Sequence, residues 1–377
     1  MRILHIGSLS KVEQNGVHRA IHTLAHLSMA QGHQVGVLNF SRSARTPGTR
    51  DLDGVSALTL PVRGLPGSVG SHAQFLGAES RAALEQLMKE WDVLHLHSVF
   101  QVDHVFVSRR GVPYVVTPHG GYHPRIVDGS AAMTKRLWLA AFDRSLLRRA
   151  ALVQTLSDSE SRHVAALQPR APTRVLPIPI VGSVPAGTDR RREADDPIVF
   201  IGRMDIAHKG LDLLLTAWAR STWSSGQGGH LVLAGPADSE TNGRLECLID
   251  ELSLRNSVEL IGPVHGADKD ALLARAKWFV HASRWEGLPL SMLEAASAGV
   301  PLLGTHETNL TERITKHAGG LVSEVSVASI SDMLDRAHAL PEDQRQHMVE
   351  GAVELARGFE PGDLADDYER LYQDAVR

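Results

Sequence analysis

Two glutamates bracket the start of an expected helix in the segment SRWEGLPLSMLEAASAGVP, residues 283–301. Glu286 precedes a Gly-Leu-Pro turn, and the helix that begins near Leu290 and Ser291 directs its first free N–H groups toward a bound phosphate. Glu294 lies one turn past Leu290, on the face that this helix shows to the same ligand. A carboxylate there would accept hydrogen bonds from vicinal hydroxyls such as those of a ribose.

Two cations follow another expected strand. Arg203 comes directly after IVFIG, and Lys209 follows six residues later, before an apolar helix. Arginine supplies a bidentate fork and lysine a point charge, a combination that suits a diphosphate. Two solvated surface charges are the alternative interpretation. Taken with the helix amides and the two carboxylates, the cations describe a site for a sugar nucleotide.

The N-terminal half offers weaker signals. Gly16 opens a helix whose N-terminus suits an anion, although a plain loop glycine explains it equally well. His119 stands between Pro118 and two glycines at the end of a strand, where we expect it to meet a ligand. His95 and His97 alternate on one strand without a metal-binding pattern and are interpreted as packing residues or as support for the site.

The length and composition of the chain limit the classes of protein to which it can belong. A chain of 377 residues exceeds the size at which one core usually stops growing, so two domains are expected. The formal net charge of −4 gives no reason to expect nucleic acid as a partner. Cys247 is the single cysteine, which fits a reducing cytoplasm. The first apolar run is too short for a signal peptide, and no run reaches the roughly 20 residues of a membrane span.

Strands and helices alternate along the chain in two series. The first runs from the strand at 2–7 to the strand at 151–157, and the second starts at 198, after a segment rich in Gly, Pro and charge. This alternation predicts an α/β protein with two doubly wound parallel sheets, which bind ligands beyond the carboxyl ends of their strands. Residues 41–72 are expected to form a loop that orders when substrate binds.

At these motifs the chain resembles a known family. The segment EGLPLSMLE, residues 286–294, matches the Glu-x7-Glu motif of the retaining GT-B glycosyltransferases of family 4. GRMDIAHKGLDLLLTAW, residues 202–218, and VVTPHG, residues 115–120, are similar to two further segments of that family, and the resemblance extends over nearly the whole chain.

The resemblance implies an architecture of two Rossmann-like domains that face each other across a cleft. The acceptor-binding domain would span residues 1–181, followed by a linker at 182–197. The domain that binds the nucleotide-sugar donor would span 198–358, and a last helix at 359–377 would cross back to the first domain.

The resemblance also implies a role for each candidate residue of the second half. Arg203 and Lys209 would bind the diphosphate of the donor and stabilise it as it leaves. Glu294 would hold the ribose. Glu286, with the amides near Gly287 and Leu288, would hold hydroxyls of the donor sugar.

In the first half, the resemblance would place His119 near the anomeric carbon and the donor sugar, and Gly16 would let the first loop close over the phosphate. The family often has paired glycines in this first loop, whereas here Asn15 precedes Gly16.

The expected reaction is transfer of a hexose-type sugar, with retention, from a nucleoside-diphosphate sugar to a hydroxyl acceptor. The acceptor would be a sugar, a lipid-linked molecule or a small molecule, in the synthesis of a polysaccharide, glycolipid or other glycoconjugate. Preorganised cations and dipoles stabilise the departing diphosphate, and no covalent nucleophile is assigned. We expect no cofactor and no metal, since the Asp51–Asp53 pair lies in the expected loop.

Two other functions fit the same architecture. A sugar-nucleotide epimerase or a phosphorylase would use different acids or a cofactor-binding lysine, neither of which is evident. A non-catalytic nucleotide-sugar-binding partner would be favoured by loss of Arg203, Lys209 or either glutamate, and all four are present.

A peripheral membrane contact is a separate hypothesis. The segment TKRLWLAAFDRSLLRRA, residues 134–150, combines basic residues with an apolar helical stripe of Trp138, Leu139, Phe142 and Leu146. Such a helix can lie on anionic lipid at the inner face of the membrane. A helix packed on the core, with a basic outer face, is the alternative.

Overall fold

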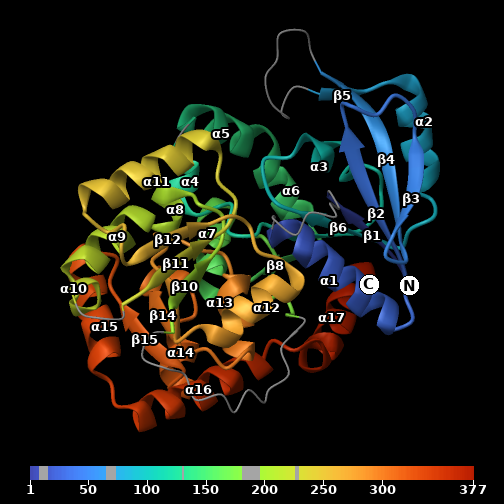
Figure 1. Cartoon of the computed structure of the whole chain (residues 1–377). Coiled ribbons are helices and arrows are strands. Elements are labelled where there is room, and N and C mark those ends of the chain that lie inside the picture. Colours follow the sequence, from blue (N-terminus) through green and yellow to red (C-terminus); the bar gives the residue numbers. More distant parts are fainter. Residues whose placement is uncertain (8–15, 65–73, 130, 181–195, 226–228) are drawn as a thin grey trace. The chain divides into compact units, whose positions relative to one another are not determined.

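The computed structural model describes the chain except for residues 8–15, 65–73, 130, 181–195 and 226–228. It divides into two compact units, of which one comprises Met1–Pro179 with Leu364–Arg377 and the other Ile180–Asp363. Each unit has one sheet, parallel in the second unit and mostly parallel in the first, with helices on both faces, as Figure 1 shows. The predicted pair of doubly wound α/β domains is therefore confirmed. Most of the expected linker lies outside the described residues.

The sheet of the first unit has the order β3-β4-β2-β1-β6-β7-β8-β9, and β5 also pairs with β4. β3 and β5 run antiparallel to β4, and the other pairs are parallel. The strands are β1 (Arg2–Ile6), β2 (Gln34–Ser41), β3 (Gly48–Leu52), β4 (Val55–Gly64), β5 (Gln74–Leu76), β6 (Val93–His97), β7 (Tyr114–Thr117), β8 (Leu152–Thr155) and β9 (Thr173–Val175).

The helices of this unit include the last helix of the chain. They are α1 (Gly16–Ala30), α2 (Ala78–Leu87), α3 (Val102–Val107), α4 (Pro124–Val127), α5 (Ala132–Trp138), the π-helical turn η1 (Leu139–Asp143), α6 (Arg144–Arg149), α7 (Asp158–Leu167) and α17 (Pro361–Val376). The chain thus returns to its first unit at its C-terminal end.

The two faces of this sheet differ in chemistry. Because side chains alternate along a strand, Leu94 and Leu96 face one core. His95 and His97 therefore share the opposite face with His5, which pairs in register with His95. This polar face meets α17, where the Tyr372 hydroxyl lies 2.9 Å from His95 Nδ1.

The second unit has a six-stranded parallel sheet of order β12-β11-β10-β13-β14-β15. Its strands are β10 (Ile198–Ile201), β11 (Leu231–Ala234), β12 (Val258–Ile261), β13 (Trp278–His281), β14 (Leu302–Thr305) and β15 (Gly320–Ser323). Its helices are α8 (Ile206–Lys209), α9 (Leu211–Arg220), α10 (Thr222–Ser225), α11 (Ser239–Glu251), α12 (Gly266–Arg275), α13 (Leu290–Ser297), the 3-10 turn η2 (His306–Thr308), α14 (Thr311–His317), α15 (Val327–Ala339) and α16 (Glu342–Arg357).

Because side chains alternate along the central strand β10, the second unit also has a hydrophobic core on each face of its sheet. Ile198 and Phe200 pack with residues of α9 and α15, and Val199 packs on the other face with residues of α13 and α16. From β10 the strand order proceeds through β11 and β12 on one side and through β13, β14 and β15 on the other. The point between β10 and β13 is therefore the topological switch point, where such sheets bind ligands.

One local expectation was wrong. Residues 48–64 form the antiparallel strands β3 and β4 and not a loop, with Asp53 and Gly54 at positive φ in the turn between them. The helix expected over residues 134–150 runs without a break from α5 to α6, and the π-helical turn η1 lies within it. None of the described helices is long and apolar enough to cross a membrane.

Candidate functional site

The switch point of the second unit collects most of the predicted residues. Arg203 and Lys209 follow β10, and Glu286 follows the neighbouring strand β13. Gly210, directly after Lys209, has φ of 63°, and a Cβ there would lie 2.1 Å from the Ala282 carbonyl oxygen. Only glycine lets these two segments approach so closely.

Lys209 and Glu286 form a buried ion pair at this point. Lys209 Nζ lies 2.6 Å from Glu286 Oε1, and the two side chains are 13% and 7% exposed. Ser283 Oγ donates a second hydrogen bond to the same oxygen at 2.6 Å. Oε2 accepts no hydrogen bond from the described residues and is therefore the atom free to meet a ligand hydroxyl.

Electrostatics keep Glu286 ionised. Burial by itself raises the pKa of this carboxyl group, but the charge of Lys209 and the nearby His281 and His208 outweigh it and lower the pKa to about 2. Because Ser283 Oγ donates to Glu286, it accepts from His281 Nδ1 at 2.8 Å. Burial lowers the pKa of His281 to about 3, so this histidine is a neutral donor near neutral pH.

His208 connects the buried pair to the surface. Its ring stacks on Trp285 with centroids 4.5 Å apart, and its Nε2 donates to the Trp285 carbonyl oxygen at 2.9 Å. Its Nδ1 is therefore an acceptor, 3.4 Å from Arg203 Nη2. The Arg203 side chain is 62% exposed, so this guanidinium can turn toward an incoming anion.

The start of α13 offers backbone donors beside Glu286. The N–H groups of Gly287, Leu288, Leu290 and Ser291 donate to no acceptor in the described part of the chain. The turn before them is held by Asn309, whose side-chain amide donates to the carbonyl oxygens of residues 286 and 287 at 2.5 and 3.2 Å. These amides form a preset cradle for an anion or a sugar oxygen.

Glu294 has a cationic partner that the sequence did not indicate. It is 8% exposed, and Lys269 Nζ on α12 lies 3.3 Å from its Oε2. Nothing in the local pattern of α12 distinguishes Lys269 from a solvated lysine, because the pairing depends on how α12 and α13 pack. The ammonium group of Lys269 orients the carboxylate of Glu294.

In the first unit, His119 lies in a turn after β7 and has φ of 53°. Its Nε2 lies 3.0 Å from His97 Nδ1. The following N–H, of Gly120, donates to Oε1 of the buried Glu160, whose Oε2 accepts from the Leu156 N–H at 2.6 Å. Glu160 thus ties the His119 turn to α7. Burial raises its pKa to about 7 against the effect of these two N–H groups.

The spacing of Ser157 and Glu160 indicates a capping box, in which the glutamate would return to the N-terminus of its own helix. Ser157 does cap α7 by accepting from the Glu160 N–H. The Glu160 carboxylate instead bridges two other segments, a role that follows from tertiary packing and that the sequence pattern missed.

Three buried histidines are close enough to bind a metal ion. His5, His95 and His97 each offer a nitrogen, and these nitrogens lie within 4.8 Å of one another. His95 uses one nitrogen with the Tyr372 hydroxyl and the other with Thr117 Oγ1 at 2.7 Å. Ligation by all three would break such bonds, so the cluster fits a hydrogen-bonded network better than a metal centre.

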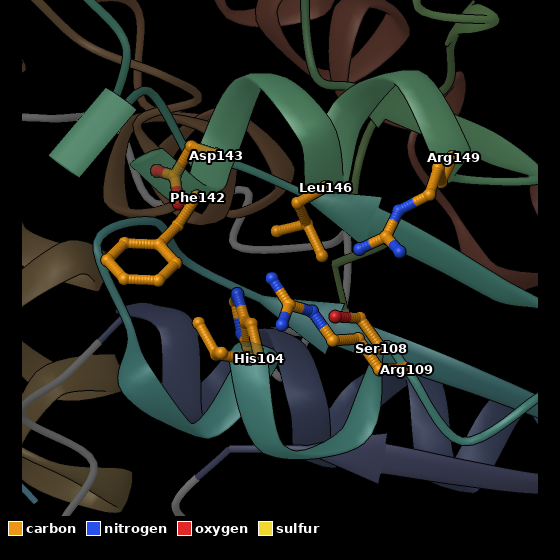
Figure 2. A pocket seen from close by; sticks show the side chains of 8 residues that line it. His104, Ser108, Arg109, Phe142, Asp143, Leu146 and Arg149 are labelled. Atoms are coloured by element: carbon orange, nitrogen blue, oxygen red, sulfur yellow. The ribbon is translucent and has the colours of Figure 1, made fainter. Parts of the chain in front are cut away.

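A pocket in the first unit lies between α3 and the η1–α6 segment (Figure 2). Arg109 follows the C-terminal end of α3, and Arg149 is the last residue of α6. Helix C-termini carry partial negative charge, and Asp143 adds a carboxylate to the lining. The pocket is therefore poorly suited to a diphosphate. It is lined by His104, Val105, Ser108, Arg109, Phe142, Asp143, Leu146 and Arg149.

Gly16 is the first residue of α1, and a Cβ at this position would meet no atom within 4 Å. The described structure therefore does not itself require glycine here. The loop before it lies outside the described residues.

Two family models match most of this chain between them. Residues 189–354 match the family described as glycosyl transferases group 1, and residues 15–180 match the glycosyl transferase 4-like domain. A GDP-mannose:cellobiosyl-diphosphopolyprenol alpha-mannosyltransferase of Xanthomonas campestris is 28% identical over 56% of this chain. The match covers 55% of that relative, so the chain spans about half the length of the curated relative it matches.

Two solved structures share the fold over almost their entire length. Sucrose-phosphate synthase from Thermosynechococcus elongatus gives a TM-score of 0.76 at 18% identity, with 99% of this chain and 98% of the other covered. The Anabaena protein HepE, in complex with UDP and glucose, gives 0.75 at 17% identity, with 99% of each chain covered. Because the two sequences are only 18% and 17% identical to this chain, the likeness supports a shared fold and nothing beyond it.

Proposed function

We propose that this chain, which matches the glycosyl transferases group 1 family and the glycosyl transferase 4-like domain in its two halves, is a GT-B glycosyltransferase that moves a hexose-type sugar, with retention, from a nucleoside-diphosphate sugar to a hydroxyl acceptor. The product would be a polysaccharide, a glycolipid or another glycoconjugate. The observation that carries the proposal is the buried, ionised Glu286, paired with Lys209 beside the open backbone donors of α13. A charge held this way at a switch point is arranged to bind and not simply to stabilise the fold.

Each part of the donor has a matching group in the second unit. Oε2 of Glu286 would accept from hydroxyls of the transferred sugar, and Glu294 from the ribose. The amides at the start of α13 would meet phosphate or sugar oxygens. In the first unit, Gly16 would let the helix N-terminus approach the phosphate, and His119 would face the transferred sugar.

Leaving-group stabilisation would supply most of the rate enhancement. Negative charge develops on the departing diphosphate, and Arg203 with Lys209 would meet it. Because Lys209 is already paired with Glu286, the exposed Arg203 would be the cation that follows the leaving group. Analysis of the product's anomeric configuration by NMR tests the retention.

We expect this transfer to need no metal ion. The cations and free amides of the second unit supply the positive potential that a bound divalent cation would otherwise supply. Equal transfer rates with and without a chelator would support this expectation, and loss of activity that Mg²⁺ or Mn²⁺ restores would contradict it.

A lipid-linked acceptor is consistent with the relative from Xanthomonas, whose name specifies a diphosphopolyprenol substrate. The apolar stripe first considered for membrane contact faces the core instead, because Leu139 and Leu146 are buried in the core of the first unit and Trp138 packs against that core. The outward residues of the same segment are Met133 and Leu137, which are 71% and 64% exposed.

These two side chains are followed along the same segment by the exposed Arg144 and Arg148, so the outer surface is apolar and basic. We expect it to rest on anionic lipid. Co-sedimentation with phosphatidylglycerol vesicles should be strong for the wild type and weak for Leu137→Glu. Equal sedimentation of the two proteins would contradict the membrane contact.

The experiment that tests the donor site is thermal unfolding against a panel of nucleoside diphosphates and their sugars. A ligand at 100 times its Kd stabilises a protein by about 2.7 kcal/mol. One nucleotide should raise the melting temperature of the wild type and raise that of Lys209→Ala and Arg203→Ala much less. Each variant is compared with its own unliganded form.

Arg220→Ala is the matched control, since Arg220 is an exposed arginine of the same unit at the far end of α9. It should respond to the nucleotide as the wild type does. If no nucleotide shifts the folded wild type, the donor site is wrong and a non-catalytic role becomes the better interpretation. A response that survives both substitutions would place the nucleotide elsewhere.

A further inference from the structure

Three histidines form a continuous hydrogen-bonded chain across the sheet of the first unit. His5 Nδ1 on β1 lies 2.9 Å from His97 Nε2 on β6. His97 Nδ1 in turn lies 3.0 Å from His119 Nε2 in the turn after β7. His5 and His97 are fully buried, whereas His119 is partly exposed, so the chain runs from the core to the edge of the sheet.

The protonation of these rings is coupled. Burial lowers the pKa of His5 and of His119 to about 3 and holds the pKa of His97 well below its ordinary value, so near neutral pH each ring is neutral and carries one proton. Each nitrogen–nitrogen hydrogen bond needs one donor and one acceptor. The chain therefore has only two consistent states, in which all three rings carry the proton on Nδ1 or all three carry it on Nε2.

The buried end of the chain favours one of these states. His5 Nε2 is buried and has no hydrogen-bond partner in the described part of the chain. A buried N–H without an acceptor is less often tolerated than a bare acceptor. His5 is therefore expected to keep its proton on Nδ1 and to donate it to His97, and His97 then donates from its own Nδ1 to His119.

The neighbouring His95 forms no hydrogen bond to these three rings with its two nitrogens. Although the His95 ring stacks on His97 with centroids 4.2 Å apart, its two nitrogens bond to Tyr372 and Thr117. No hydrogen bond to Nδ1 of His119 is present among the described residues. This nitrogen is therefore the free end of the chain.

We propose that His5, acting through His97, fixes His119 as the Nδ1–H tautomer, so that His119 donates a hydrogen bond to an oxygen of the transferred sugar. His5 and His97 are then positioning residues, and His119 is a donor and not the base that deprotonates the acceptor. The sugar as recipient of this bond rests on the proposed function, whereas the tautomer does not.

The tautomer is measured directly by long-range ¹H–¹⁵N NMR on the full-length, histidine-labelled protein without ligand. The wild type should show a protonated Nδ1 at His119, and in His97→Leu, which removes the donor to His119 Nε2, this preference should be lost. His26→Gln removes a histidine of the same unit that bonds to His22 and not to the chain, and it should leave the His119 signal unchanged. A wild type with the proton on Nε2 overturns the proposal, and this result stands even if His97→Leu does not fold.

The use of this donor is tested by two substitutions at His119. Asparagine places an N–H near the position of Nδ1 and tolerates the positive φ of this turn, whereas aspartate offers only acceptors. We expect kcat/KM for sugar transfer to fall less than about tenfold in His119→Asn and more than about a hundredfold in His119→Asp. Equal losses would overturn the donor role. Absence of transfer by the wild type would refute the proposed function and leave the tautomer measurement intact.

Discussion

Lys209 Nζ and Glu286 Oε1 are 2.6 Å apart, although 77 residues separate them in the sequence. The two groups come from the segments that follow β10 and β13, strands that are neighbours only because the sheet reverses its order there. In a buried ion pair, the cost of removing both charges from water offsets most of their attraction. The pair by itself is therefore weak evidence that it stabilises the fold. Its position beside the free amides of α13 makes binding its better explanation.

Loss of one partner of this pair should therefore cost more than loss of both. Lys209→Met leaves a buried carboxylate without its cation, and we expect the free energy of unfolding to fall by about 3–5 kcal/mol. Glu286→Gln should also destabilise. The double variant should be more stable than the sum of the two single effects predicts. Urea unfolding of the four proteins measures this coupling.

The exposed pair Arg255–Asp250 is the control for that cycle, because the two side chains are 58% and 55% exposed. Arg255→Ala should hardly move the urea midpoint. Strict additivity of the Lys209 and Glu286 effects would show that the pair is not coupled in solution.

A second prediction concerns Glu160, whose two oxygens accept from the N–H groups of Gly120 and Leu156. Glu160→Gln turns one acceptor into a donor that faces a backbone N–H, so we expect a loss of about 1–3 kcal/mol. Because Gly120 follows His119, sugar transfer should slow as well. Urea unfolding and a transfer assay check the two effects.

Glu79→Gln, on the exposed first turn of α2, is the matched substitution and should change neither quantity appreciably. If Glu160→Gln unfolds like the wild type, the carboxylate does not hold the turn.

Much of the second unit could be predicted because its motifs are local. The Gly-Leu-Pro turn, the start of α13 and the cations after β10 all lie within a few residues of a strand end, and the strand order of α/β sheets then brings them together. The partner of Glu294 could not be predicted in this way. Lys269 meets it only through the packing of two helices, which no period in the sequence encodes.

The histidine chain of the first unit could not be predicted either, because its contacts also depend on tertiary structure. His5, His97 and His119 are far apart in sequence, and only the strand register aligns them. The hairpin of β3 and β4, by contrast, carried a usable signal. Asp53 followed by Gly54, between stretches of β-forming residues, is a favoured two-residue turn, and the charges around it hid the pattern.

Two glycine substitutions should separate backbone constraint from ligand contact. Gly210→Ala places a Cβ against the Ala282 carbonyl oxygen at a positive φ, so we expect a loss of several kcal/mol, on the scale of a severe core defect. The Cβ that Gly16→Ala adds would have no atom within 4 Å, so this substitution should leave the melting temperature nearly unchanged. Thermal unfolding measures both.

The same Gly16→Ala protein also tests the expected approach of the donor phosphate. If the phosphate passes close to this backbone, KM for the donor should rise while the melting temperature stays constant. An unchanged KM would remove Gly16 from the binding site without affecting the roles of Lys209 and Glu286.

The last prediction concerns pH. His104 is buried, and burial lowers its pKa to about 4, below the value of about 6.5 in the unfolded chain. The unfolded state therefore binds more protons than the folded state between about pH 4 and pH 6.5. The stability that the neutral ring contributes is complete above pH 6.5 and is lost as the pH falls toward 4. The slope is at most about 1.4 kcal/mol per pH unit.

In His104→Gln this loss should disappear, so the gap between variant and wild type should shrink or reverse by up to about 3 kcal/mol from pH 6.5 to pH 4. Val107→Ala, on the same helix, removes buried volume without a titrating group and should lower stability by the same amount at every pH. Glu160 acts in the opposite sense, because its raised pKa favours folding at low pH, but it is present in all three proteins. Parallel pH profiles for the wild type and His104→Gln would mean that His104 is already protonated, or solvated, in the folded state.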